Sequence, residues 1–264
     1  MAPVKFLSLA CASALLVAQA NTQGAKGLNA GSSSGGTVTY TAALGKETVC
    51  LSDLNDARVA AGLANFVTTA DDLKWPAIKD SGDMEEGDPW LPVCQALIPK
   101  DESNAETRNR EKAAFGSGTY AFMALNSDQA DCTAAVDHWK AAFSNFTSIP
   151  PSKAQAGDLY KQHNLSFVAL YNPKDGAAAD CRVVTCTQKT AGGEPERAGQ
   201  GETGGKEGYA LLCMTTPDAF TDKDTAPFTE DQWSKIKTSL TGSAAAVAPS
   251  LLAFATVALG LAAL

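Results

Sequence analysis

Asp180-Cys-Arg-Val-Val-Thr-Cys186 is a short apolar run rich in β-branched residues, and it predicts a strand within a buried sheet. Two more apolar runs, residues 165–171 and 209–215, are bounded by Asn-Pro, Gly-rich or Thr-Pro turn sequences. We expect all three runs to be strands of a sheet that is covered on both faces. Residues 191–208, dense in Gly and Glu, should form the loop between the last two strands.

Helical patterns lie on both sides of these predicted strands. Apolar residues recur along one stripe in residues 48–65 and 131–146, and residues 101–114 predict a charged, exposed helix. The run Thr229-Glu-Asp-Gln232 is a capping box that opens a last helix ending near residue 240. Because each face of a sheet needs cover, this order predicts one α+β or layered α/β/α domain.

The N-terminus has the features of an export signal. Lys5 precedes an apolar run over residues 6–17, which closes on Ala18-Gln19-Ala20, the small-x-small pattern of a signal peptidase site. Residues 1–20 are therefore predicted to be a signal peptide, with a buried N-terminal helix as the alternative. Residues 21–36 are rich in Gly, Ser and Asn, so we expect a flexible leader.

The C-terminus has the features of a lipid-attachment signal. Residues 244–264 carry no charge, and 251–264 form an apolar tail that stops at the last residue. Small residues, Thr241-Gly242-Ser243-Ala244, precede it, which is the pattern for replacement of the tail by a glycosylphosphatidylinositol (GPI) lipid on Gly242 or Ser243. A tail-anchored helix is the alternative. The expected organisation is a single ectodomain, 37–241, and a removed tail signal, 242–264, on a protein anchored to the outer leaflet of the plasma membrane.

Charge and cysteine content limit the classes of function. Lys and Arg number 21 against 29 Asp and Glu, a net charge of −8, so nucleic acid is not an expected partner. Removal of Cys11 with the signal peptide leaves six of the seven cysteines, which predicts three disulfides with 15 pairings open. Asn145-Phe-Thr147 and Asn164-Leu-Ser166 fit the acceptor pattern for N-glycosylation.

Several of these segments resemble the CAP superfamily, the cysteine-rich secretory, antigen 5 and pathogenesis-related 1 proteins. Residues 51–63 are similar to its first helix, and His163-Asn-Leu-Ser-Phe-Val168, residues 180–186 and residues 209–213 are similar to later segments in the same order. The resemblance implies a CAP-like three-layer α/β/α sandwich with a mostly antiparallel central sheet, stapled by disulfides.

The CAP pattern also implies how the cysteines pair. In that pattern, the first cysteine of a Cys-x4-Cys segment forms a disulfide with a cysteine on the next strand. This implies that Cys181 pairs with Cys213. Cys186 follows after an odd separation and should point to the opposite sheet face, toward a cysteine of the first helix. The implied disulfides are therefore Cys181–Cys213, Cys50–Cys186 and, by elimination, Cys94–Cys132.

A second resemblance runs nearly end to end. The first-helix sequence VCLSDLNDAR, the stretches TYAFMALNSDQADC and AAVDHWKAAFSNF, six cysteines and a lipid-signal tail resemble the GPI-linked SAG surface antigens of Eimeria-type coccidian parasites. This resemblance implies a non-enzymatic surface antigen used for host-cell attachment and invasion or for immune display. Its implied partners are the plasma membrane, a host-cell surface receptor and host antibodies. Because exposed loops commonly carry recognition, residues 80–88 and 191–208 are the candidates for antibody or partner contact.

The sequence departs from the CAP pattern at positions that would bind a metal ion or take part in catalysis. CAP proteins present two histidines in a metal-binding cleft, but the first-helix position here is Leu54, so only His163 is kept. Zinc needs about three or four ligands, so no metal and no cofactor are expected. A catalytic triad could use only His138 or His163, and no GxSxG motif accompanies either. His138 is expected to be solvated, and His163 is expected to be a strand-edge residue with a local hydrogen bond.

The alternative function is that of a lipid, sterol or other small-ligand carrier, and a divergent hydrolase is less favoured.

Overall fold

Four strands and five α-helices form the part of the chain that the computed structural model describes, which is residues 37–79, 82–99, 115, 118–191 and 205–242. These residues belong to one compact unit. The predicted signal peptide, leader and 101–114 helix lie outside the described residues. So do Ser243, the rest of the predicted tail, most of the 191–208 loop and the start of the 80–88 loop.

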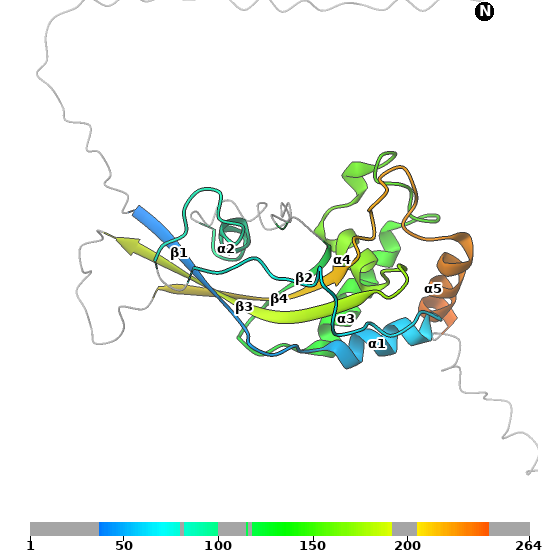
Figure 1. Cartoon of the computed structure of the whole chain (residues 1–264), viewed down its shortest axis with the longest axis horizontal. Coiled ribbons are helices and arrows are strands. Elements are labelled where there is room, and N and C mark those ends of the chain that lie inside the picture. The colour runs from blue at the N-terminus through cyan, green and yellow to red at the C-terminus, as the bar shows by residue number, and fades with distance from the viewer. Residues whose placement is uncertain (1–36, 80–81, 100–114, 116–117, 192–204, 243–264) are drawn as a thin grey trace, which may run out of the picture. The chain divides into compact units, whose positions relative to one another are not determined.

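The strands form one antiparallel sheet in the order β1-β3-β4-β2 (Figure 1). Their bounds are Thr37–Leu44 for β1, Thr119–Leu125 for β2, Ala178–Ala191 for β3 and Lys206–Thr216 for β4. The strands predicted at 181–187 and 209–215 lie inside β3 and β4. For residues 119–125, which form β2, the sequence was compatible with either a helix or a strand. The sequence did not predict β1.

The helices confirm three predictions and overturn one. α1 (Leu51–Ala60), α3 (Cys132–Ala141) and α5 (Glu230–Gly242) lie where helical periodicity places them. The predicted strand 165–171 is wrong, because this run lies in and just after the helix α4 (Gln162–Leu170). Seven of its nine residues are buried, and a helix buried nearly all round has the same apolar pattern as a buried strand. α2 (Leu91–Leu97) and the 3₁₀ turns η2 (Ala142–Asn145) and η3 (Gly157–Leu159) complete the set.

Separate apolar clusters cover the two faces of the sheet. On one face α1, α3, α4 and α5 pack around fully or largely buried aromatic residues such as Trp139, Phe167 and Trp233. On the other face α2 and its flanking segments bury Tyr40 and Trp90 against the strands. The observed fold is thus an α+β arrangement with an antiparallel sheet covered on both faces.

The edge strand β2 is protected by side chains of the helical layer. The Phe122 N–H donates to Ser166 Oγ at 3.0 Å, and Gln162 Nε2 donates to the Tyr120 carbonyl at 3.0 Å. Trp139 Nε1 donates to the Phe122 carbonyl at 2.9 Å. Main-chain groups of a free edge otherwise attract further strands, so α4 blocks pairing along the first half of β2.

The disulfides correct two of the three expected pairs. The structure joins Cys50–Cys132, Cys94–Cys186 and Cys181–Cys213. Cys181 and Cys213 are directly opposite in the β3–β4 register, as the CAP pattern implies. Cys186 does point to the opposite face from Cys181, but α2 covers that face and supplies Cys94. The expected Cys50–Cys186 and Cys94–Cys132 are wrong, because Cys50 and Cys132 begin α1 and α3 on the other face.

A buried arginine ties α1 to the end of α4. Arg58 is 2% exposed, and its guanidinium donates to the carbonyl oxygens of Ala64, Leu170 and Asn172 at 2.8, 3.2 and 2.9 Å. It also lies over the Phe66 ring, 3.8 Å from the centroid. Burial lowers the pKa of Arg58 to about 10, so the group stays charged at neutral pH. The negative end of the α4 dipole stabilises that charge.

Candidate functional site

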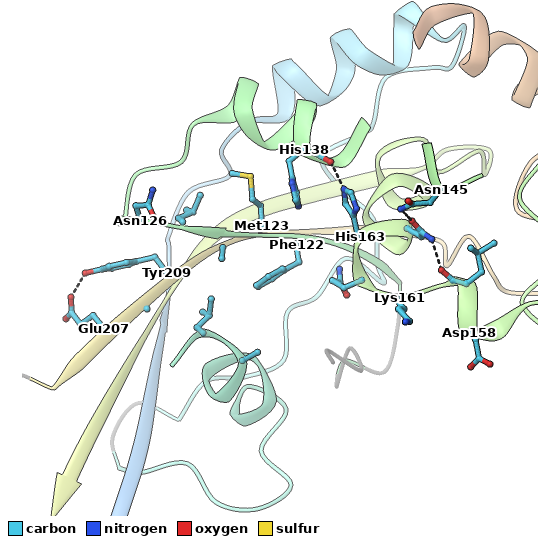
Figure 2. Close-up of a pocket in the computed structure, with 18 residues that line it drawn as sticks. Phe122, Met123, Asn126, His138, Asn145, Asp158, Lys161, His163, Glu207 and Tyr209 are labelled. Carbon is cyan, nitrogen blue, oxygen red and sulfur yellow. Dashed lines mark hydrogen bonds between the residues drawn. The ribbon is translucent and has the colours of Figure 1, made fainter. Parts of the chain in front are cut away.

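A groove of about 1250 Å³ lies beside the second half of β2, where the cover of α4 ends (Figure 2). Phe122, Met123 and Leu125 of β2 and Leu97 of α2 give it apolar walls. Polar side chains from α3, η2, η3 and α4 form its opposite rim. A groove with apolar walls and a polar rim is the usual character of a ligand site.

Gly208 allows α2 to approach β4 at one wall of the groove. A Cβ atom at this position would lie 2.7 Å from Ile98 Cγ1 and 3.0 Å from Leu97 Cβ. Both contacts are closer than ordinary packing permits, so the wall depends on the absence of a side chain at Gly208.

The two histidines of the chain meet at the rim of the groove, and we call them the histidine pair. The rings of His138 in α3 and His163 in α4 are stacked with centroids 4.6 Å apart and planes at 25°. Nε2 of His163 lies 2.7 Å from the His138 carbonyl oxygen. Partial burial of the stacked His138 ring, with a smaller contribution from the charge of His163, lowers the pKa of His138. The stack therefore favours uncharged imidazole at His138.

The sequence predicted neither the histidine pair nor its place. His138 is exposed, in accord with its position off the buried face of its helix. His163 is bonded locally as expected, but it stands on a helix and not at a strand edge, because α4 replaces the predicted strand. Residues 25 positions apart on two different helices share no periodic signal, so a single sequence could not show that they stack.

The two predicted glycosylation sequences also meet beside the groove. Asn145 Nδ2 donates to Asn164 Oδ1 at 2.7 Å, and Asn164 Nδ2 donates to the Leu159 carbonyl at 2.7 Å (Figure 2). Asn145 is exposed, whereas Asn164 is 6% exposed and Ser166 is fully buried. The two sequences thus occupy very different environments.

The positions taken from the CAP cleft do not come together around the groove. Leu54 is fully buried in the core beneath α1 and is not part of the groove lining, while His163 is at its rim. Within the described ranges, no group of three or more His, Cys, Asp or Glu side chains is placed to hold a metal ion. All six cysteines between residues 37 and 242 are in disulfides, so none of them is a thiolate nucleophile.

Charged residues of both signs surround the mouth of the groove. Lys161 and Asp158 stand on one side and Glu207 on the other. The Tyr209 hydroxyl donates to the Glu207 carboxylate, and this hydrogen bond raises the pKa of Tyr209. The arrangement offers hydrogen-bond donors, acceptors and aromatic faces to a bound molecule.

Helix α5 ends at the predicted lipid-attachment position. Trp233 and Ile236 bury its first half in the core, while Thr241 and Gly242 at its end are exposed. Among the residues whose structure is described, no helix has the length and apolar character needed to cross a bilayer.

Comparison with known proteins gives two matches. The family model of the sporozoite surface antigen (SAG) protein domain matches residues 46–255. The sporulated oocyst TA4 antigen of Eimeria tenella is 31% identical over 200 residues, which cover 72% of this chain and 74% of that protein. No solved structure matches the chain.

Proposed function

The chain belongs to the sporozoite surface antigen (SAG) family, and from this premise we propose that it is a non-enzymatic antigen held on the parasite surface by a GPI lipid. The lipid is attached at Gly242 or Ser243 after export and removal of residues 1–20. The mature domain contacts a host-cell surface receptor and is displayed to host antibodies.

The end of α5 is the observation that carries this proposal. Helix α5 reaches an exposed Gly242, which lies within the cluster of small residues that precedes the apolar tail in the sequence. A transamidase needs an accessible, small residue followed by a hydrophobic tail, and this chain end meets that need. Treatment of cells that express the full chain with a phosphatidylinositol-specific phospholipase should release the protein. Retention on the cells would argue for the tail-anchored alternative.

The disulfides support passage through an oxidising compartment. Three disulfides tie β3 to β4, α2 to β3 and the start of α1 to α3. Such bonds persist in secreted and surface proteins and are rare in the cytosol. The fold is therefore suited to the exterior of the cell.

We also propose that the groove is the surface through which the domain attaches to host cells. Lys161 is exposed at the rim, so Lys161→Glu reverses a charge at the groove without touching the core. Lys237→Glu on exposed α5 is the matched control. Soluble 21–242 should bind host cells saturably, with the affinity of K161E weakened by about 10-fold, or about 1.4 kcal/mol, and that of K237E unchanged. Binding that does not saturate would remove attachment from the proposal, and equal loss in both variants would remove the groove.

A small-ligand carrier is the second candidate, and the apolar walls of the groove favour it. Phe122, Met123 and Leu125 offer the apolar surface that a lipid or sterol would cover. The CAP-like three-layer fold, which we also retain as a proposal, would place this chain beside lipid-associated relatives. Displacement of a fluorescent sterol from the purified protein would support this candidate, and no saturable uptake would exclude it.

A further inference from the structure

The two glycosylation sequences lie in very different environments, since Asn145 is exposed and Asn164 is buried. We propose that Asn145 is an N-glycan acceptor of this domain and that Asn164 is not. The proposal rests on the proposed function in one respect, because it requires that the chain enter the secretory pathway.

Asn145 offers everything that the modification requires. It ends the η2 turn, and both Asn145 and Thr147, the hydroxyl residue of the acceptor pattern, are exposed. Its Nδ2 carries two hydrogens, and one of them bonds to Asn164 Oδ1. The other can be replaced without loss of that bond, so a glycan on Asn145 is compatible with the fold.

Asn164 has the same sequence pattern in a closed environment. Its side chain is 6% exposed and is held between Asn145 and the Leu159 carbonyl. Ser166, its hydroxyl residue, is fully buried and bonded to the Phe122 N–H. A sugar on Asn164 would fill the groove rim from inside and separate α4 from its neighbours. Chains modified there before folding would fail to reach this structure.

The modification itself is a group transfer from a lipid-linked oligosaccharide. A bond forms between Asn145 Nδ2 and the anomeric carbon of the donor's first sugar. The bond from that carbon to the pyrophosphate oxygen of the lipid carrier breaks, and the carrier leaves as lipid pyrophosphate while the amide loses one proton. Because Asn145 lines the groove, the first sugar then lies at its rim (Figure 2).

The test expresses the full chain in cultured insect cells and maps glycan sites by amidase treatment in H₂¹⁸O followed by mass spectrometry. We expect the ¹⁸O label at position 145 and none at position 164. Thr147→Val should remove the glycan, whereas Thr147→Ser, which keeps the acceptor pattern, should retain it. Both substitutions are at an exposed side chain, so neither should disturb folding.

A parallel arm replaces residues 1–20 by the signal peptide of an unrelated secreted protein. If the native chain is not exported but this arm is glycosylated at Asn145 and not at Asn164, the export part of the proposed function fails, while the choice of Asn145 over Asn164 as the acceptor in this fold stands. Folded, exported molecules with label at position 164, or with none at position 145 in this arm, would overturn the proposal.

Discussion

Replacement of Arg58 by methionine should destabilise the fold more than any single surface change. Methionine fills a similar volume but leaves the carbonyl groups of Ala64, Leu170 and Asn172 without their donor. Each buried carbonyl left without its donor costs about 1–3 kcal/mol, so three of them cost about 3–9 kcal/mol. Removal of the guanidinium also removes the desolvation of a buried charge, which opposes folding, so we expect the free energy of unfolding to fall by an amount near the lower end of this range, about 3–4 kcal/mol.

Two further variants separate the contributions at this site. Arg58→Lys keeps the charge but cannot reach three carbonyl groups with a planar fork, and it loses the stack on Phe66, so we expect a loss of about 2 kcal/mol. Lys237→Met removes an exposed cation from α5 and should change stability by less than about 0.5 kcal/mol. Urea unfolding at pH 7, followed by tryptophan fluorescence, measures all three. A loss below about 1 kcal/mol for R58M would refute the view that this arginine joins α1 to α4.

Three other changes test separate parts of the structure. Because burial lowers the pKa of His138 below its usual 6.5, the folded state binds fewer protons, so stability should fall as the pH falls through about 6.5. Urea unfolding at pH 8 and pH 5 measures this difference, and His138→Phe should make it smaller. Gly208→Val should push α2 off β4 by contact with Ile98 and cost about 1–3 kcal/mol, whereas an unchanged midpoint of thermal unfolding would contradict that close packing. Ser166→Ala leaves the Phe122 N–H at the sheet edge without an acceptor, for a loss of about 1–3 kcal/mol by urea titration, and no loss would mean that water replaces the hydroxyl.

Local patterns predicted the elements that have one buried face. Residues 131–146 have apolar side chains along one face, and so do the residues that follow the capping box at 229–232. The structure has helices at both places. The box itself is formed, with the Thr229 N–H donating to Gln232 Oε1 at 2.9 Å. The sequence did not predict α4 as a helix, because a helix that is buried on nearly all sides has the same continuous apolar pattern as a buried strand. The sequence did not predict α2 either, because this helix lies in a proline-containing segment. A proline in the first turn is nevertheless compatible with a helix.

Long-range features could be predicted only where a local rule constrained them. The alternation of side chains along a strand placed Cys181 and Cys186 on opposite faces, and this holds. Alternation does not show which element covers the second face. Because the sequence did not predict α2, it did not predict Cys94 as the partner of Cys186. The histidine pair likewise depends on how α3 and α4 pack, which no spacing within either helix encodes.

The covalent structure of the C-terminus of the mature chain distinguishes a lipid anchor from a retained apolar tail. All of the protein can be extracted from expressing cells with detergent, treated with the phospholipase and digested, and the mass of its C-terminal peptide can be measured. We predict a peptide that ends at Gly242 or Ser243 and carries an ethanolamine phosphate-linked glycan remnant. A peptide that continues to Leu264 with no such mass would contradict lipid anchoring and, with it, the proposed display of this antigen on the parasite surface.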